Sequence, residues 1–215
     1  MSRDRLRRTL EAEAATWVMD DPERQAEKLR RERMRHYGMA KALLLDKLDT
    51  SNMCVLEIGG GPLPLSDILP FKSRIVIDPL SAEYRKIAPC PDHVGQYAEQ
   101  FVWEEPLEKF DLAIATNSLD HVQSPLAAAM RIQDAMKPGG YVAILCAENN
   151  ALTHPHEAHE HNLTADIVES WFCRDYETVW KLTYAADGFR YGWVEHNGRR
   201  GQPAFALLMR RCTGF

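Results

Sequence analysis

The apolar run at residues 55–58 contains one acidic residue and leads directly into three glycines, Gly59, Gly60 and Gly61. The run predicts a short buried strand. Glycine tolerates positive φ and lets a backbone approach a ligand closely. In an open α/β sheet, a turn of this kind at the carboxyl end of a strand is the usual position of a nucleotide-like ligand. We therefore expect the rest of the chain to form the scaffold and walls of a pocket at this turn.

The 215 residues are enough for one α/β domain with a modest extension. A net charge of −5 argues against a nucleic-acid partner, because such proteins normally present a basic face. The five cysteines are scattered and form no C-x-x-C pair, which predicts a reducing compartment without a disulfide framework or zinc knuckle. No apolar run has the length of a membrane span and no secretory apolar region follows the N-terminus, so we expect a cytoplasmic protein without a membrane partner.

Residues 1–50 have the apolar spacing of amphipathic helices. Asp21 followed by Pro22 predicts a helix start, with an acidic N-cap and proline at the first helical position. The charged run at residues 28–35 is typical of a solvated helix face, and a basic surface for an acidic partner is the alternative. We expect residues 1–50 to form an N-terminal helical cap and residues 51–215 to form one globular domain.

Strand-like and helix-like segments alternate from residue 54 onward. The predicted strands lie at 54–58, 74–77, near Tyr97, at 110–115 and at 141–146, and the predicted helices at 64–69, 124–136 and 165–173. Residues 137–140 predict a tight turn. The tail instead has strand-like runs at 177–184, 189–195 and 204–210, joined by turn signals such as Asn197-Gly198. This pattern predicts an α/β fold with a mostly parallel sheet that closes with antiparallel strands.

Asp78 ends the second predicted strand, nineteen residues after Gly59. An acid at this position accepts hydrogen bonds from both ribose hydroxyls of a nucleoside, and NAD-binding units share the arrangement. A dinucleotide fingerprint starting at Gly59 would place Pro64 where a third glycine is needed for close helix packing. The closing antiparallel strands are also foreign to that fold, so the pattern disfavours a nicotinamide oxidoreductase.

Residues 55–62 resemble the first motif of the class I S-adenosylmethionine-dependent methyltransferases. Asp78 matches the ribose-binding acid of that family. Residues 110–122 resemble the fourth-strand motif of its small-molecule branch, and residues 136–144 resemble the turn and fifth strand that follow. The four motifs cover roughly residues 50–150 in the family's order. The chain departs from the family pattern at Leu63, where a third glycine is usual.

The resemblance implies a Rossmann-like, mostly parallel seven-stranded sheet with antiparallel closing strands, and S-adenosyl-L-methionine as the cofactor. Glu57 would orient the glycine loop or reach the amino group of the methionine moiety, and Asp78 would hold the ribose. The other implied cofactor-binding residues are Gly59, Gly60, Gly61, Ala98, Glu99, Asn117 and Ser118. For Glu99 the alternative is an ordinary surface residue, and for Asn117 it is an N-cap or turn residue.

Candidate catalytic residues are His121, His159 and His161. His121 faces the acceptor or serves a helix start. The segment at residues 154–162 holds four of the eight histidines, and we weigh an acceptor-side wall or base, a metal site and a solvated polar loop. Methyl transfer itself requires no metal, and it needs a general base only for an acceptor such as a hydroxyl.

Trp17, Tyr37 and Met39 form either a lid over the cofactor or simple packing of the cap against the sheet. The function expected is methyl transfer to an O, N or C atom of a small-molecule acceptor. The alternatives are methylation of a protein or peptide side chain, and a non-catalytic S-adenosylmethionine-binding module. The sequence leaves open whether the protein is a monomer or a homodimer.

Overall fold

The computed structural model describes residues 3–18, 21–40, 44–89, 91–101, 108–148, 161–172, 174–184 and 204–213. The strands are β1 (Cys54–Ile58), β2 (Ser73–Ile77), β3 (His93–Val94), β4 (Phe110–Thr116), β5 (Met136–Ala147), β6 (Tyr176–Tyr184) and β7 (Ala204–Arg211). The helices are α1 (Arg3–Trp17), α2 (Pro22–Ala40), the 3-10 helix η2 (Leu65–Ile68), α3 (Ser81–Tyr84), α4 (Pro125–Ala135) and α6 (Ala165–Phe172).

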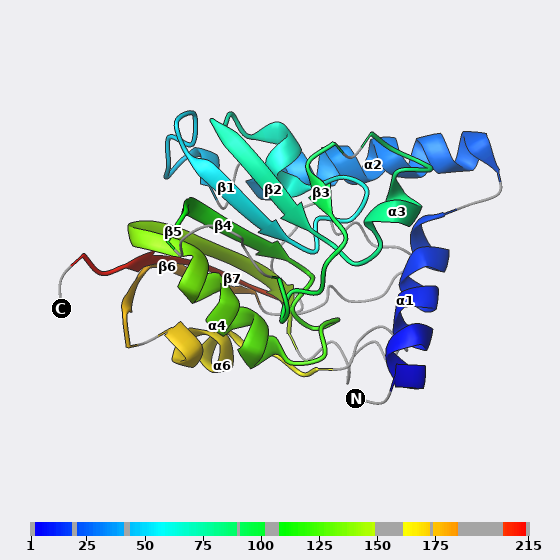
Figure 1. The fold of residues 1–215 in the computed structure, drawn as a ribbon. Coiled ribbons are helices and arrows are strands. Elements are labelled where there is room, and N and C mark those ends of the chain that lie inside the picture. Colours follow the sequence, from blue (N-terminus) through cyan, green and yellow to red (C-terminus); the bar gives the residue numbers. More distant parts are fainter. Residues whose placement is uncertain are drawn as a thin grey trace.

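Within these residues the strands form one seven-stranded sheet in the order β3-β2-β1-β4-β5-β7-β6 (Figure 1). The strands from β3 to β5 pair in parallel, whereas β7 is antiparallel to both β5 and β6. The predicted fold class, including its antiparallel closing strands, is confirmed.

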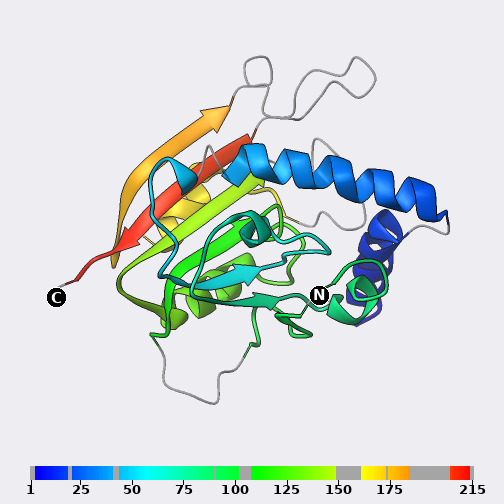
Figure 2. The same ribbon diagram turned by 90° about the horizontal axis from the view of Figure 1, so that it is seen from above.

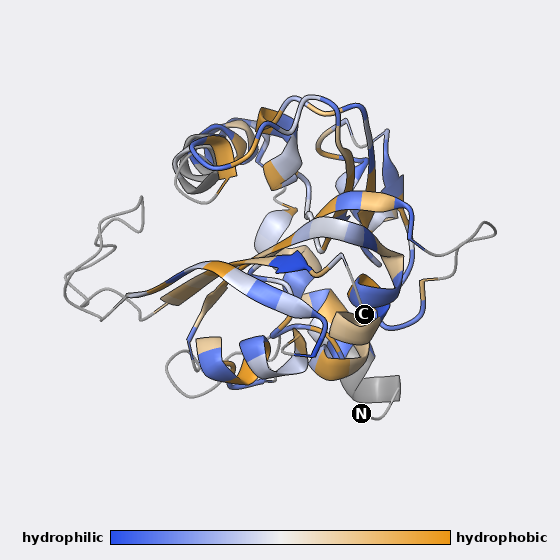
Figure 3. Ribbon diagram, turned by 90° about the vertical axis from the view of Figure 1, so that its left-hand side faces the viewer, coloured by the Kyte–Doolittle hydropathy of each residue, from blue (hydrophilic) through white to orange (hydrophobic). Residues whose placement is uncertain are grey.

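Alternate residues of the central strands pack into two cores on opposite faces of the sheet, as the period of two in a strand requires. Leu56 and Ile58 of β1 belong to the core that α4 and α6 cover. Val55 belongs to the core on the other face, which η2 and residues 44–48 cover. In Figure 3 the helices carry both hydrophobic and hydrophilic residues, as expected of elements that cover a sheet.

Helix α1 lies beyond the carboxyl ends of β1, β2 and β4, beside α3, in both ribbon views (Figures 1 and 2). Helix α2 follows it, and its start is capped as the sequence predicts. The Oδ1 atom of Asp21 accepts hydrogen bonds from the N–H groups of Glu23 and Arg24, at 2.9 and 3.2 Å. Helix α1 thus lies at the edge of the sheet where the glycine turn follows β1.

The predicted position of the third strand is wrong. The third strand is His93–Val94, not a segment near Tyr97. Pairing with β2 uses the carbonyl groups of Asp92 and Val94, which accept from the N–H groups of Val76 and Asp78 at 3.0 Å each. The chain leaves the ladder after Val94, so Tyr97 has no strand partner there.

The turn predicted at residues 137–140 lies inside β5, as an irregularity in its pairing with β4. Gly139 has a φ of +79°, which lets the strand bend without ending. The strand predicted at residues 189–195 lies outside the described residues.

Candidate functional site

The glycine turn follows β1 at the carboxyl edge of the sheet. Gly59 and Gly61 have φ values of +65° and +59°, which glycine adopts without steric cost. A Cβ on Gly59 would lie 2.3 Å from Cβ of Ser118, so the turn packs directly against the end of β4. A Cβ on Gly61 would meet nothing nearer than Cζ2 of Trp17, at 4.0 Å. Gly59 therefore serves close packing, whereas Gly61 borders open space beneath α1.

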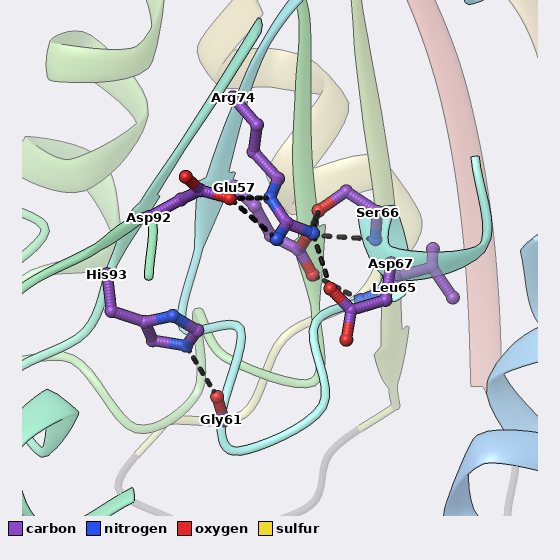
Figure 4. Close-up of polar contacts among 8 residues, drawn as sticks. All are labelled: Glu57, Gly61, Leu65, Ser66, Asp67, Arg74, Asp92 and His93. Carbon is purple, nitrogen blue, oxygen red and sulfur yellow. Dashed lines mark hydrogen bonds and ion pairs between the residues drawn. The ribbon is translucent and has the colours of Figure 1, made fainter. Parts of the chain in front are cut away.

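The turn is tied to the neighbouring strands through its backbone. The Gly59 N–H donates to the carbonyl oxygen of Ile77 at 2.8 Å. The Gly61 N–H donates to Oδ2 of Asp78 at 3.0 Å. The Gly61 carbonyl oxygen lies 2.8 Å from Nε2 of His93, as Figure 4 shows. A carbonyl oxygen only accepts, so His93 donates from Nε2. Both polar groups of Gly61 are thus held by side chains from two other elements.

Asp78 is directed at the turn and is buried, with 5% of its surface exposed. Its Oδ1 atom accepts from the N–H of Leu80 at 2.9 Å, and its Oδ2 atom accepts from Gly61. Burial raises the pKa of Asp78 to about 6, and the nearby carboxylates of Glu13 and Glu57 act in the same direction. Each carboxylate oxygen keeps a lone pair for a further donor. This acid is suited to accept two hydroxyl groups of a ligand.

Glu57 lies beneath the turn and is buried. Its carboxylate accepts from the N–H of Leu65 at 2.7 Å, the N–H of Ser66 at 3.0 Å and the hydroxyl of Ser66. Burial raises the pKa of Glu57, while these donors and the Arg74 guanidinium oppose the rise. The carboxylate therefore holds the chain where it enters η2.

Arg74 of β2 extends this network (Figure 4). Its side chain is 6% exposed. Its guanidinium donates to Asp67 at 2.6 Å, to Asp92 at 2.8 Å and to the Ser66 hydroxyl at 3.1 Å. Because these partners come from η2 and from the segment before β3, Arg74 joins these two segments across the start of β2.

At the end of β4, Asn117 has a φ of +46° and accepts from the N–H of Ala147 at 3.1 Å through Oδ1. It therefore links the carboxyl ends of the parallel strands β4 and β5. The next residue, Ser118, is 7% exposed and its buried hydroxyl has no hydrogen-bond partner among the described residues. An unpartnered buried hydroxyl beside the glycine turn is available to a ligand.

The two residues proposed for the adenine side differ in their surroundings. Ala98 is buried and belongs to the core on the α4 face. Glu99 is half-buried, and its Oε1 atom accepts from the N–H of Ser124, the N-cap residue of α4, at 3.0 Å. In this state Glu99 joins its segment to the start of α4.

His121 lies between α1 and the end of β4. Its Nδ1 atom is 3.6 Å from Oε2 of Glu13, and its Nε2 atom is 3.7 Å from Oδ2 of Asp120. The other carboxylate oxygen of Glu13 accepts from the Trp17 indole N–H at 2.9 Å.

The sequence did not single out Glu13 or His93, since their contacts join segments far apart in the chain. Trp17 was expected to form either a lid or a packing contact, and it lies against the turn at Gly61.

His161 contacts the same region, because its Nε2 atom lies 2.7 Å from the carbonyl oxygen of Val122. His159 and residues 154–160 lie outside the described residues.

Among the residues that are described, no group of three His, Cys, Asp or Glu side chains has the arrangement of a metal site. The helices in the described ranges include none with the length and hydrophobicity of a membrane span.

These observations fit a nucleoside with a charged methionine moiety. Asp78 offers lone pairs for ribose hydroxyls, Gly61 leaves room for close approach, and Ser118 supplies an unpartnered hydroxyl. Carboxylates at this edge also suit a positively charged ligand.

A family model described as a methyltransferase domain matches residues 26–182 of the chain. Two uncharacterized proteins of Mycobacterium tuberculosis, from strains CDC 1551 and H37Rv, are each 29% identical over 140 residues. The match covers 56% of this chain and 43% of each relative, so the chain spans less than half of their length.

Solved structures with the same fold include the N-methyltransferase NodS from Bradyrhizobium japonicum in complex with S-adenosyl-L-homocysteine. It is 17% identical with a TM-score of 0.60, over 84% of this chain and 87% of NodS. An S-adenosylmethionine-dependent methyltransferase from Mesorhizobium loti is 13% identical with a TM-score of 0.61, over 82% and 98% of the two chains. A possible histamine N-methyltransferase from Thermotoga maritima is 14% identical with a TM-score of 0.59, over 88% and 97%.

Proposed function

Because the chain belongs to the methyltransferase-domain family, we propose that it transfers the methyl group of S-adenosylmethionine to a small-molecule acceptor. The observation that carries this proposal is the pairing of Asp78 with Gly61. Their 3.0 Å hydrogen bond sets a buried carboxylate beside a backbone that has room for a ligand. S-adenosylmethionine supplies an electrophilic methyl group on a positively charged sulfur, and that charge is lost as the methyl group leaves.

The chain contributes mainly orientation and exclusion of water. Asp78 would accept the ribose hydroxyls, and Gly59, Gly60 and Gly61 would let the backbone pass beside the cofactor. Glu57 would act indirectly by holding the turn through Leu65 and Ser66. The Ser118 hydroxyl and the backbone near Asn117 would face the ligand at the end of β4, and Ala98 and Glu99 would lie on the adenine side.

The position of α1 supports a small acceptor. Trp17 covers the open side of Gly61, and Glu13 of the same helix reaches His121 at 3.6 Å. A helix across this edge leaves less access for a folded protein than for a small molecule. One structural neighbour is described as an N-methyltransferase and another as a possible histamine N-methyltransferase, which favours an amine nitrogen as the atom methylated.

His121 is the proposed acid–base residue, with His161 and His159 on the acceptor side. The contact of His161 with the carbonyl oxygen of Val122 supports this arrangement, because it brings the second histidine to the loop that carries the first.

Isothermal titration with S-adenosylmethionine, S-adenosylhomocysteine and NAD tests the cofactor. We expect the first two to bind and NAD to fail, and the opposite ranking would overturn the proposal. Methyl-labelled S-adenosylmethionine added with a cell extract then tests the acceptor. Label in the small-molecule fraction is expected, whereas label only in protein would favour side-chain methylation. Binding without any transfer would favour a non-catalytic module.

A further inference from the structure

Helix α1 brings the carboxylate of Glu13 to the glycine turn and to the end of β4. The Oε1 atom of Glu13 accepts from the indole N–H of Trp17 at 2.9 Å, and Trp17 lies against the open side of Gly61. The Oε2 atom of Glu13 lies 3.6 Å from Nδ1 of His121, three residues beyond Ser118. Glu13 therefore connects α1 with the segments that follow β1 and β4.

Glu13 is also within electrostatic reach of Asp78, at the end of β2. Burial raises the pKa of Asp78 to about 6, and the carboxylate of Glu13 adds to this rise. A ligand whose ribose binds Asp78 and whose other end reaches the unpartnered hydroxyl of Ser118 crosses the glycine turn. Glu13 borders that path from the α1 side. Since the sulfonium of S-adenosylmethionine joins the ribose to the amino-acid chain, the positive charge of the ligand belongs on this path.

Glu13 differs from the two carboxylates beneath the turn in what it holds. Glu57 accepts from the first residues of η2, and Asp78 accepts from the N–H groups of Leu80 and Gly61. Each of these two acids therefore holds its own part of the chain. The side chain of Glu13 is 26% exposed, and its carboxylate oxygens keep lone pairs beyond the bond from the indole. A partly exposed carboxylate attracts a nearby cation, and salt weakens that attraction.

We propose that Glu13 is a specificity-determining residue that recognises the positive charge on the sulfur of S-adenosylmethionine and distinguishes it from the neutral thioether of S-adenosylhomocysteine. This inference rests on the proposed methyl transfer. Glu13 acts in binding and does not lower the barrier, because the charge that it favours is lost in the transition state. The product has no charge on sulfur, so Glu13 attracts it less and favours its exchange for a new cofactor molecule.

Isothermal titration with three ligands tests this role without any acceptor, at about pH 7.5, where histidines are mostly neutral. S-adenosylmethionine and S-adenosylhomocysteine share their adenosine and amino-acid groups and differ in the methyl group and the charge on sulfur. Sinefungin carries an ammonium group in place of the methylsulfonium, so it separates the effect of charge from that of the methyl group. Glu13→Gln removes the charge and keeps an amide oxygen for the indole of Trp17. Its dissociation constants for S-adenosylmethionine and sinefungin should rise at least about threefold relative to that for S-adenosylhomocysteine.

Glu11→Gln is the matched control, because it removes a carboxylate of the same helix whose side chain is 66% exposed. It should leave all three dissociation constants within about twofold of the wild type. Equal losses of affinity for the three ligands in Glu13→Gln would mean that Glu13 only supports the packing of α1, and would overturn the proposal. Unchanged binding of all three ligands in Glu13→Gln would overturn it as well.

Salt provides a second measurement that needs no substitution. In the wild type, the dissociation constant of S-adenosylmethionine divided by that of S-adenosylhomocysteine should rise between about 0.05 M and about 0.5 M sodium chloride, because salt screens a partly exposed charge. The ratio should rise less in Glu13→Gln. A ratio that does not depend on salt in the wild type would contradict the role of Glu13. Failure of all three ligands to bind either protein would instead contradict the proposed function.

Discussion

His93 donates a hydrogen bond from Nε2 to the carbonyl oxygen of Gly61 at 2.8 Å, although the two residues are 32 positions apart. His93 is 4% exposed, and burial lowers its pKa, so the ring stays neutral and keeps one proton for this contact. The third strand, short as it is, therefore helps to hold the glycine turn.

His93→Ala should weaken binding of S-adenosylhomocysteine about threefold to tenfold, because this change in affinity corresponds to the free energy of one hydrogen bond. His93→Gln retains an amide donor and should recover part of the loss. Isothermal titration measures both. Equal binding by the wild type and His93→Ala would show that the turn holds its shape without this contact.

Gly59→Ala and Gly61→Ala form a matched pair with similar φ values and different surroundings. The methyl group at residue 59 would collide with Ser118, so we expect a loss of unfolding free energy of more than about 2 kcal/mol in urea denaturation. At residue 61 the space is open, and the cost should be only the strain of the left-handed backbone, about 1 kcal/mol. Binding of S-adenosylhomocysteine should nevertheless fall in Gly61→Ala. The reverse order of stability would contradict the packing described for the turn.

Glu57→Ala should destabilise the fold by about 3 kcal/mol, because it leaves the N–H groups of Leu65 and Ser66 without their buried acceptor. Glu83→Ala is the control, because the half-exposed carboxylate of Glu83 pairs with Lys86 at the surface, and the change should alter stability by less than about 0.5 kcal/mol. Urea denaturation at pH 7 compares them, and a loss no larger than that of the control would remove the structural role.

The raised pKa of Asp78 predicts how stability and cofactor affinity depend on pH. Its folded pKa of about 6 lies above the ordinary value of 3.8, so the folded protein binds more protons between these values. The contribution of Asp78 to stability should rise as the pH falls from 7 to 4, by about 3 kcal/mol at most. Asp78→Asn should abolish this contribution. Cofactor hydroxyls donate to the ionised form, so affinity should fall below pH 6, with a proton released on binding there. Affinity that improves below pH 6 would contradict this role.

Much of the scaffold is predictable from the sequence because it depends on local signals. The apolar runs fix β1 and β4, the three glycines fix the turn, and Asp78 ends a strand whose pairing places it beside the turn. The antiparallel end of the sheet follows from strand-like runs in the tail.

The remaining features depend on contacts that no local pattern records. β3 has two residues, too few for a recognisable period. The glycines at 139–140 are typical of a turn, yet the pairing of Met136 with Phe110 carries the strand through them. The contacts of His93 and Glu13 require the docking of whole elements, and no spacing within either segment marks them.

Binding of S-adenosylhomocysteine to Asp78→Ala, measured by isothermal titration, tests the cofactor site most directly. The control is Asp111→Asn, which changes an acid that contacts Lys137 and the N–H of Cys54, at the start of β4 and away from the turn. We predict that Asp78→Ala raises the dissociation constant more than tenfold and that Asp111→Asn leaves it within about twofold. An unchanged dissociation constant in Asp78→Ala, with the fold intact, would contradict the cofactor site proposed for this edge of the sheet.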